Sequence, residues 1–186
     1  MGYDPQKHHR RSTRLQGYDY SRVWAYFVTL CTQDRQCLFG EVVDGDMRLN
    51  DWGQIVADTW EWLATQYAHV ELDGWIVMPN NVHGIIVIHN DGCRGGSRTA
   101  PTRPATRKPL GRLIGAFKTV STQRINELRG SPGMPVWQRN YYEHIIRSEE
   151  SLSRIRQYIL NNPARWAFDR ENRLTVAPEP ENAWLT

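Results

Sequence analysis

The segment Asn81-Val82-His83 carries two side chains that can bind a metal ion, one residue apart. The apolar, β-branched residues that continue to Ile88 predict a strand, and alternate side chains of a strand share one face. Asn81 and His83 would then point the same way, so an amide oxygen and an imidazole nitrogen could hold one divalent cation. A hydrogen-bonded structural pair beside a turn explains the same spacing, and the pattern by itself leaves both interpretations open.

A second group of polar side chains lies toward the C-terminal end, where Arg154, Tyr158 and Asn162 recur at a spacing of four residues. In a helix this spacing stacks side chains on one face, so a cation, a phenol and an amide oxygen would stand in a row. The alternative is again structural: a half-buried tyrosine, a solvated arginine and an asparagine that ends the helix before Pro163. By pattern alone, the structural interpretation is the simpler one.

Both groups depend on the elements that carry them, and hydrophobic periodicity predicts those elements. In chain order we expect a strand over 25–31, a hairpin through Asp44-Gly45, a helix capped by Asn50 or Asp51 that ends near Gln66, and strands over 70–78 and 82–88. A helix with an inward stripe from Leu110 to Leu128 that Gly130 ends, a strand over about 141–146, and a helix capped by Ser148 follow. This order predicts an α+β fold, with a ferredoxin-like antiparallel sheet, helices on one face and a C-terminal helix that carries Tyr158.

The distribution of charge is more informative than the net charge, which is only +3. Between residues 94 and 129 cations recur and Glu127 is the one acidic residue, while the N-terminal segment adds further cations. A solvated loop and a tail explain either region alone. Two such regions, with eight Trp and eight Tyr available to stack on bases, favour a polyanionic partner.

We divide the chain into a basic N-terminal segment over residues 1–22, a domain over 23–168 with a basic loop over 90–109, and a C-terminal tail over 169–186. The three cysteines form no C-x-x-C pair, so we expect reduced thiols in a cytoplasmic protein. We expect neither a signal peptide nor a membrane span, because no apolar run approaches about 18 residues. The motifs of P-loop proteins, dinucleotide-binding proteins, serine hydrolases and zinc proteases are absent from the sequence.

Long strings in a fixed order connect the two polar groups. WIVMPNNVHGIIVI, LGRLIGAFKTVSTQRIN, VWQRNYYEHIIR and RIRQYILNNPARW resemble the REP-associated tyrosine transposases, which belong to the single-tyrosine HUH nucleases. The resemblance runs from about Arg10 to Phe168 and so covers nearly the whole chain.

The resemblance implies a metal site and a nucleophile. Family members hold a divalent metal with two histidines that one hydrophobic residue separates, and with a polar residue four positions after the catalytic tyrosine. Carried over to this chain, Tyr158 corresponds to the nucleophile, His83 to the second histidine and Asn162 to the polar ligand. Asn81 stands where the first histidine is expected, and its amide oxygen suits Mg²⁺ or Mn²⁺, which we expect as the cofactor.

The resemblance also implies a partner, the DNA hairpins of repetitive extragenic palindromes beside a short single strand. We expect DNA contacts from cations of the N-terminal segment, the basic loop and the two later helices: Arg10, Arg11, Arg14, Arg103, Arg107, Lys108, Lys118 and Arg154. The protein would act as a monomer or a homodimer, in the cytoplasm with the nucleoid and without a membrane.

Three hypotheses remain open. The chain is an active single-strand DNA endonuclease and transferase, or it binds hairpin DNA but has weak or no cleavage because Asn81 replaces a histidine. Outside this family, it could be a metal-free domain whose basic loop binds a protein or RNA. A covalent adduct, hairpin binding without an adduct, and no hairpin affinity are the results that separate the three.

Overall fold

The computed structural model describes residues 24–89, 108–169, 171–172 and 175. Its strands are β1 (Trp24–Cys31), β2 (Gly40–Val43), β3 (Asp46–Leu49), β4 (Val70–Met78), β5 (Asn81–Ile88) and β6 (Tyr142–Ile146). Its helices are α1 (Asp51–Gln66), α2 (Leu110–Leu128) and α3 (Glu149–Asn161), with short 3₁₀ turns η1 (Gln33–Arg35) and η2 (Pro163–Phe168). The order of elements is the one that the sequence predicts.

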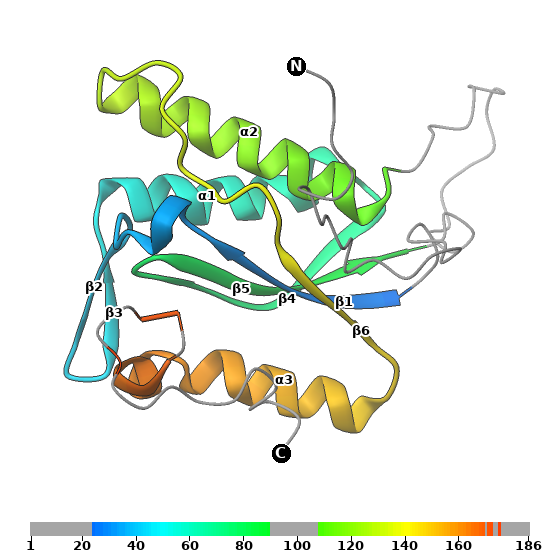
Figure 1. Ribbon diagram of the computed structural model, residues 1–186. Coiled ribbons are helices and arrows are strands. Elements are labelled where there is room, and N and C mark those ends of the chain that lie inside the picture. Colours follow the sequence, from blue (N-terminus) through cyan, green and yellow to red (C-terminus); the bar gives the residue numbers. More distant parts are fainter. Residues whose placement is uncertain (1–23, 90–107, 170, 173–174, 176–186) are drawn as a thin grey trace, which may run out of the picture.

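Four strands form one antiparallel sheet in the order β4-β5-β1-β6, and β2 and β3 form a separate hairpin. With the hairpin set aside, this is the ferredoxin-like arrangement of two split βαβ units. Helices α1 and α2 cover one face of the sheet, and α3 lies against the other (Figure 1). The expected α+β fold is confirmed, and the helix that carries Tyr158 lies on the face of the sheet opposite α1 and α2.

The two faces of the sheet bury two separate apolar clusters. The larger cluster lies under α1 and α2 and includes Trp60 and Phe117, whose rings meet edge to face at 5.2 Å between centroids. The smaller cluster joins Phe27 and Ile85 of the sheet to Ile155 and Ile159 of α3. Alternation along β1 sends neighbouring side chains to opposite clusters, so the residues facing α3 are fixed by the strand register.

Local signals explain where the helices begin and end. Asn50 caps α1 by accepting a hydrogen bond from the backbone N–H of Gly53 at 2.9 Å, and Ser148 caps α3 by accepting one from Ser151 at 3.2 Å. Gly130, with φ of 62°, follows the end of α2 in the left-handed conformation that favours glycine. The helix that positions Tyr158 therefore has a defined start.

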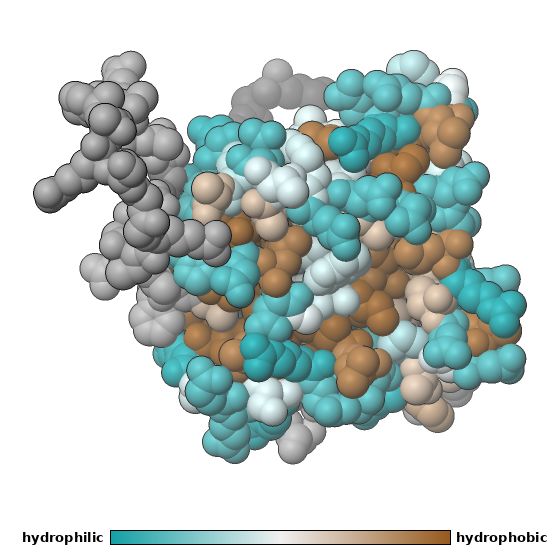
Figure 2. Space-filling model, turned by 180° about the vertical axis from the view of Figure 1, so that it is seen from behind, coloured by the Kyte–Doolittle hydropathy of each residue, from teal (hydrophilic) through white to brown (hydrophobic). Residues whose placement is uncertain are grey.

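The surface differs from expectation at one apolar position. Leu128, the last residue of α2, is 56% exposed, although the periodic stripe placed it inward. Seen from the side opposite to Figure 1, hydrophilic residues cover much of the surface and hydrophobic ones gather between them (Figure 2). Within the described ranges, no helix is long and apolar enough to cross a membrane.

Gly84 of β5 is a point of close contact between α1 and the sheet, because a methyl group there would overlap the buried indole of Trp60. We expect Gly84→Ala to lower the free energy of unfolding by about 1–3 kcal/mol, the usual cost of overpacking. Gly115→Ala is the control, since no atom lies within 4 Å of a methyl group at that helical position. It should be neutral or raise stability by up to ~1 kcal/mol. Urea unfolding of both variants measures this, and equal stabilities would contradict the packing.

Candidate active site

A cleft of about 220 Å³ opens on the α3 side of the sheet. Strand register builds its floor, because antiparallel pairing places Thr29 opposite His83 and Cys31 opposite Asn81. Residues directly opposite each other on paired strands share one face. The cleft is lined by residues from β1, η1, β5, β6, α3, the loop before β6 and the segment after η2: Phe27, Thr29, Cys31, Arg35, His83, Gln138, Asn140, Tyr141, Tyr142, Tyr158 and Glu171.

Tyr158 and His83, which are distant in sequence, meet in this cleft. Their ring centroids are 5.4 Å apart and the rings meet edge to face at 76°. Phe27 lies on a further side, 6.0 Å from the Tyr158 ring at 89° and 5.9 Å from the imidazole at 15°. Ile155 and Ile159, on either side of Tyr158 along α3, are buried against the sheet and hold the helix there.

The imidazole of His83 is only 2% exposed and has one nitrogen engaged. Its Nδ1 lies 2.9 Å from Oγ1 of Thr29, and if Nδ1–H donates this bond the lone pair of Nε2 stays available. Burial lowers the pKa of His83, while Asp169 and Glu171 pull it the other way. A neutral imidazole with an available nitrogen is the form that binds a metal ion.

Several buried side-chain atoms have no hydrogen-bond partner among the described residues, and four of them belong to candidate ligands: Oδ1 of Asn81, Nε2 of His83, Oδ1 of Asn162 and Oδ2 of Asp169. Each belongs to a side chain that is at most 6% exposed. Leaving a buried acceptor unpaired costs about 1–3 kcal/mol, so each of these atoms calls for a partner. All four are oxygen or nitrogen atoms of the kinds that bind a divalent cation.

The side-chain amides of Asn81 and Asn162 are positioned by their places at the start of β5 and the end of α3. Nδ2 of Asn81 donates to Oδ1 of Asn80 at 3.1 Å, which assigns the amide nitrogen to that bond and leaves Oδ1 as the open atom. Asn162 follows Tyr158 by one turn and ends α3. In the described ranges, no group of three or more His, Cys, Asp and Glu side chains is arranged to hold a metal ion, so a cation here would need the amides as ligands.

The structure adds Asn80, Asp169 and Glu171 to the residues that the sequence pattern singles out. Asn80 is fully buried, and its Nδ2 donates to the carbonyl oxygens of Arg35 at 3.1 Å and Glu171 at 2.7 Å. These bonds tie the β4–β5 turn to the segment after η2. Asp169 and Glu171 lie in what we expected to be a tail, yet they are only 6% and 8% exposed. Asn80 adjoins a candidate ligand and could have been singled out, whereas Asp169 stands in no recognisable motif.

Cys31 is the other potentially reactive group in the cleft. Its Sγ donates to Oε2 of Glu171 at 3.2 Å. Burial, followed by the charge of Glu171, raises the pKa of the Cys31 thiol. A thiol that stays protonated is neither a good nucleophile nor a metal ligand, so the tyrosine remains the candidate nucleophile.

The predicted DNA-binding residues fall into two groups. Arg10, Arg11, Arg14, Arg103 and Arg107 lie outside the described residues. Lys108 donates to the Tyr67 hydroxyl at 3.0 Å just before α2, and Nη1 of Arg154 lies 3.9 Å from Glu150 on α3. Nζ of Lys118 donates to the carbonyl oxygens of Gln138 at 2.7 Å and Asn140 at 2.9 Å, so it already supports the approach to β6.

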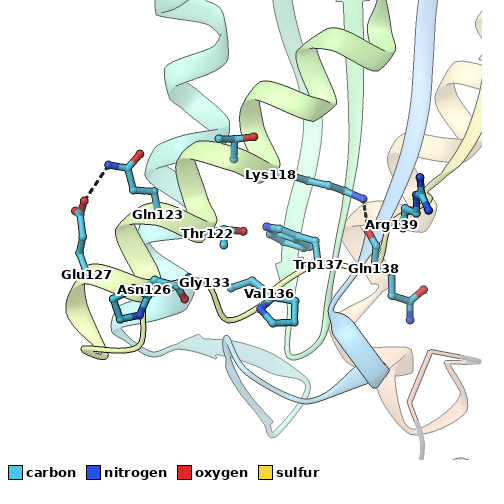
Figure 3. A pocket seen from close by; sticks show the side chains of 13 residues that line it. Lys118, Thr122, Gln123, Asn126, Glu127, Gly133, Val136, Trp137, Gln138 and Arg139 are labelled. Carbon is cyan, nitrogen blue, oxygen red and sulfur yellow. Dashed lines mark hydrogen bonds between the residues drawn. The ribbon is translucent and has the colours of Figure 1, made fainter.

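A larger hollow of about 650 Å³ lies between α2 and the segment that leads to β6 (Figure 3). Its polar side chains are largely paired with one another: Gln123 donates to Glu127 at 2.9 Å, and Nε1 of Trp137 donates to Ser121 at 2.9 Å. Burial lowers the pKa of Lys118, at its edge, to about 8. His83 and Tyr158 do not line this hollow, so the smaller cleft is the candidate active site.

A bidentate ion pair anchors α3 to the edge of the sheet. Nε and Nη2 of Arg156 donate to the two carboxylate oxygens of Asp73 at 2.9 Å and 2.6 Å. Asp73 lies where the β4–β5 register shifts, between Leu72 and Trp75. Such fork-shaped pairs add geometric specificity to their energy. Arg156 precedes Tyr158 by two residues, so the pair fixes the helix close to the tyrosine.

Among known proteins, one relative is similar to this chain over most of its length. No family model matches the chain. An uncharacterized protein of Haemophilus influenzae is 38% identical over 175 residues, which cover 90% of this chain and 96% of that protein.

Among solved structures, a REP-associated tyrosine transposase bound to a REP hairpin has a TM-score of 0.55 at 17% identity, covering 84% of this chain and 74% of that one. At this identity the similarity establishes the shared fold alone. A proposed transposase of Deinococcus radiodurans has a TM-score of 0.46 at 22% identity, covering 81% of this chain and 97% of that one, and we draw no conclusion from it.

The hydrogen bonds from Arg156 hold the pKa of Asp73 below its ordinary value of about 3.9. The stability from a lowered carboxyl pKa is present above the unfolded-state value and is lost as the pH falls through the folded-state value. We therefore expect Asp73→Asn to be less stable than wild type by about 1 kcal/mol at pH 7, and this gap to shrink below about pH 4. Urea unfolding at several pH values measures it.

The control for that experiment is Glu150→Gln, because Glu150 is exposed and lies 3.9 Å from Arg154. Its gap to wild type should stay close to zero at every pH. A gap for Asp73→Asn that does not depend on pH would show that the ion pair adds nothing to the attachment of α3.

Proposed function

The chain belongs to the same family as the uncharacterized Haemophilus influenzae protein, and we propose that it is a metal-assisted tyrosine transposase and single-strand DNA endonuclease. Its proposed substrate is palindromic, REP-type hairpin DNA. Tyr158 attacks a phosphodiester and becomes linked to the 5′-phosphate. The shared fold with a REP-associated tyrosine transposase, whose structure contains a REP hairpin, supports this substrate class.

One observation carries the proposal: the phenol of Tyr158 shares a cleft with a buried imidazole whose Nε2 has no hydrogen-bond partner in the described part of the chain. The ring contact at 5.4 Å places the nucleophile candidate next to the ligand candidate. A tyrosine with only a packing role would not need unpaired buried donors beside it. The sequence spacing alone could not distinguish these two roles.

The proposed chemistry is a displacement at phosphorus. The phenolic oxygen of Tyr158 forms a new bond to phosphorus, and the bond from phosphorus to the 3′ oxygen breaks. The phenol loses its proton, the 3′ oxygen gains one, and the products are a 5′-phosphotyrosine and a 3′-hydroxyl. Because a free phenol has a pKa near 10, it needs help at neutral pH. Arg154, one turn before Tyr158, is the candidate to favour the phenolate or to hold the phosphate.

Asn81, His83 and Asn162 are the residues that we propose to hold Mg²⁺ or Mn²⁺. A bound ion of this kind would neutralise a non-bridging phosphate oxygen and so reduce repulsion of the incoming phenolate. The chain itself orients the parts: Phe27 and His83 confine the Tyr158 ring, and Thr29 fixes the imidazole from its other nitrogen. A ring held in place before the substrate arrives has less freedom to lose on the way to the reaction.

The proposed nucleophile, Tyr158, and the proposed metal ligand His83 line the same cleft of one chain. Tyr158 packs on His83 of the same molecule, and the Arg156–Asp73 pair anchors its helix to the same sheet. A single copy therefore suffices for the proposed reaction, and we propose that the protein can act as a monomer.

The alternative, a hairpin-binding protein with weakened or lost cleavage, is motivated by Asn81. Loss of catalysis would remove the need for unpaired donors in the core. Oδ1 of Asn81 and Oδ1 of Asn162 nevertheless remain buried without a partner among the described residues. This retained donor set favours the active enzyme.

Tyr158→Phe tests the nucleophile. With a labelled single-stranded REP hairpin and Mn²⁺, wild type should form a covalent protein–DNA adduct that survives denaturing electrophoresis, and the variant should form none, because the attacking oxygen is gone. Hairpin affinity should stay within about tenfold, since the missing hydroxyl is worth at most the ~0.5–1.5 kcal/mol of one hydrogen bond.

Tyr142→Phe is the matched control, because Tyr142 belongs to β6 and lines the same cleft. We expect it to keep forming the adduct. An adduct that persists in Tyr158→Phe would refute the role of Tyr158. Tight binding by wild type without any adduct would favour the non-cleaving alternative, and no binding at low salt would refute both.

Asn81→His tests the position of the amide ligand. Imidazole is a stronger ligand than a neutral amide for transition metals, so Mn²⁺ affinity and adduct yield should both rise, if Asn81 occupies a ligand position. Asn161→His, at an exposed position next to Asn162, should change neither. Titration calorimetry with Mn²⁺ and the gel assay provide the measurements, and a fall in both quantities for Asn81→His would show that Asn81 is not a ligand.

A further inference from the structure

The segment after η2 brings a carboxylate to the site that no sequence pattern singled out. We infer that Asp169 is a ligand of the divalent cation, so that the donor set is two amides, one imidazole and one carboxylate. This inference rests on the proposed metal site and adds to it a residue from beyond the tyrosine helix.

Distance is the first argument. Oδ2 of Asp169 lies 4.0 Å from Nε2 of His83. That is too long for a direct hydrogen bond, and neither atom has a hydrogen-bond partner within the described ranges. A divalent ion takes nitrogen and oxygen ligands at about 2.0–2.2 Å, so it can touch two atoms that are up to about 4.2 Å apart. The separation of these two atoms therefore lies within the range that two ligands of one ion can span, near its upper end.

The second argument is that a hydrogen bond to Oδ1 holds Asp169 in place and leaves Oδ2 available for a ligand bond. Its Oδ1 accepts a hydrogen bond from the backbone N–H of Glu171 at 2.7 Å. The carbonyl of Glu171 in turn accepts a hydrogen bond from Asn80, the neighbour of Asn81, at 2.7 Å. The carboxylate is thus tied through the backbone to the turn that carries another proposed ligand. Supporting bonds of this kind are what orient ligands around a metal.

Charge is the third argument. Asn81, Asn162 and a neutral His83 contribute no charge, and a site made of these alone would bind a divalent cation weakly. The other buried carboxylate nearby, Glu171, has Oε2 engaged by Nε of Arg35 at 3.0 Å and by the Cys31 thiol at 3.2 Å. Asp169 is therefore the residue that can supply negative charge to the ion. A set dominated by oxygen donors suits Mg²⁺ and Mn²⁺ rather than softer metals.

A purely structural role for Asp169 would use Oδ1 alone. Oδ2 would then be a carboxylate oxygen buried without compensation, which destabilises a protein. The structural role and the ligand role consequently predict opposite effects of removing the charge from the metal-free protein. Replacement by asparagine keeps the shape and Oδ1, so it separates the two.

The test is titration of the full chain with Mn²⁺ alone, by calorimetry, for wild type, Asp169→Asn and Glu171→Gln. Changing even a residue that only supports a ligand lowers metal affinity by about 10- to 100-fold, so Asp169→Asn should bind Mn²⁺ at least about tenfold more weakly. Glu171→Gln removes an equal charge from a neighbouring buried position and should lose much less. Without metal, Asp169→Asn should melt at or above the wild-type temperature, and added Mn²⁺ should raise its melting temperature less than that of wild type.

Four results would overturn the inference. Equal losses in Asp169→Asn and Glu171→Gln would show a general effect of charge instead of ligation. Unchanged Mn²⁺ affinity in Asp169→Asn, with binding abolished in His83→Ala, would remove Asp169 from the site and leave the proposed function intact. Absence of Mn²⁺ binding by wild type would refute this inference together with the metal-assisted reaction. A metal-free melting temperature of Asp169→Asn below that of wild type would indicate the structural role and count against ligation.

Discussion

The packing of α3 on the face of the sheet opposite α1 and α2 is the constraint on which the candidate site depends. Ile155 and Ile159 are almost fully buried against Phe27 and its neighbours, and each such side chain contributes roughly 1.5–3 kcal/mol through burial. Tyr158 lies between them in sequence, so the apolar contacts that attach the helix also press the phenol against His83. If α3 were displaced, the sheet would keep Asn81 and His83 but lose the proposed nucleophile and Asn162.

The two faces of the sheet differ in what they contribute. One buries the larger apolar cluster, and the other carries the candidate site. The larger cluster under α1 and α2 holds most of the buried aromatic residues and gives the sheet a rigid support. The α3 face has a small cluster and uses the remaining area for polar groups. A central strand such as β5, paired on both sides, can present His83 without freedom to move. Unpaired buried donors are tolerated here because the opposite face stabilises the strand that carries them.

The segment after η2 changes how the end of the domain is understood. Asp169 and Glu171 are buried, and Asn80 donates to the backbone of Glu171. Two buried carboxylates beside one imidazole would be unfavourable without compensation. Glu171 is engaged by Arg35 and Cys31, whereas Oδ2 of Asp169 has no hydrogen-bond partner in the part of the chain that is described. This asymmetry between neighbouring carboxylates is the physical basis for assigning them different roles.

The sequence by itself determined the elements and the local faces. Periodicity, the Asn50 and Ser148 caps and the Asp44-Gly45 turn act within a few residues, so the order of strands and helices and the placement of Asn81 with His83 could be predicted. Only the tertiary structure decided that Tyr158 meets His83, because that contact joins elements whose separation along the chain carries no local signal. Asp169 escaped prediction for the same reason. Leu128 was wrongly placed inward, since a periodic stripe does not tell where the surface that covers it ends.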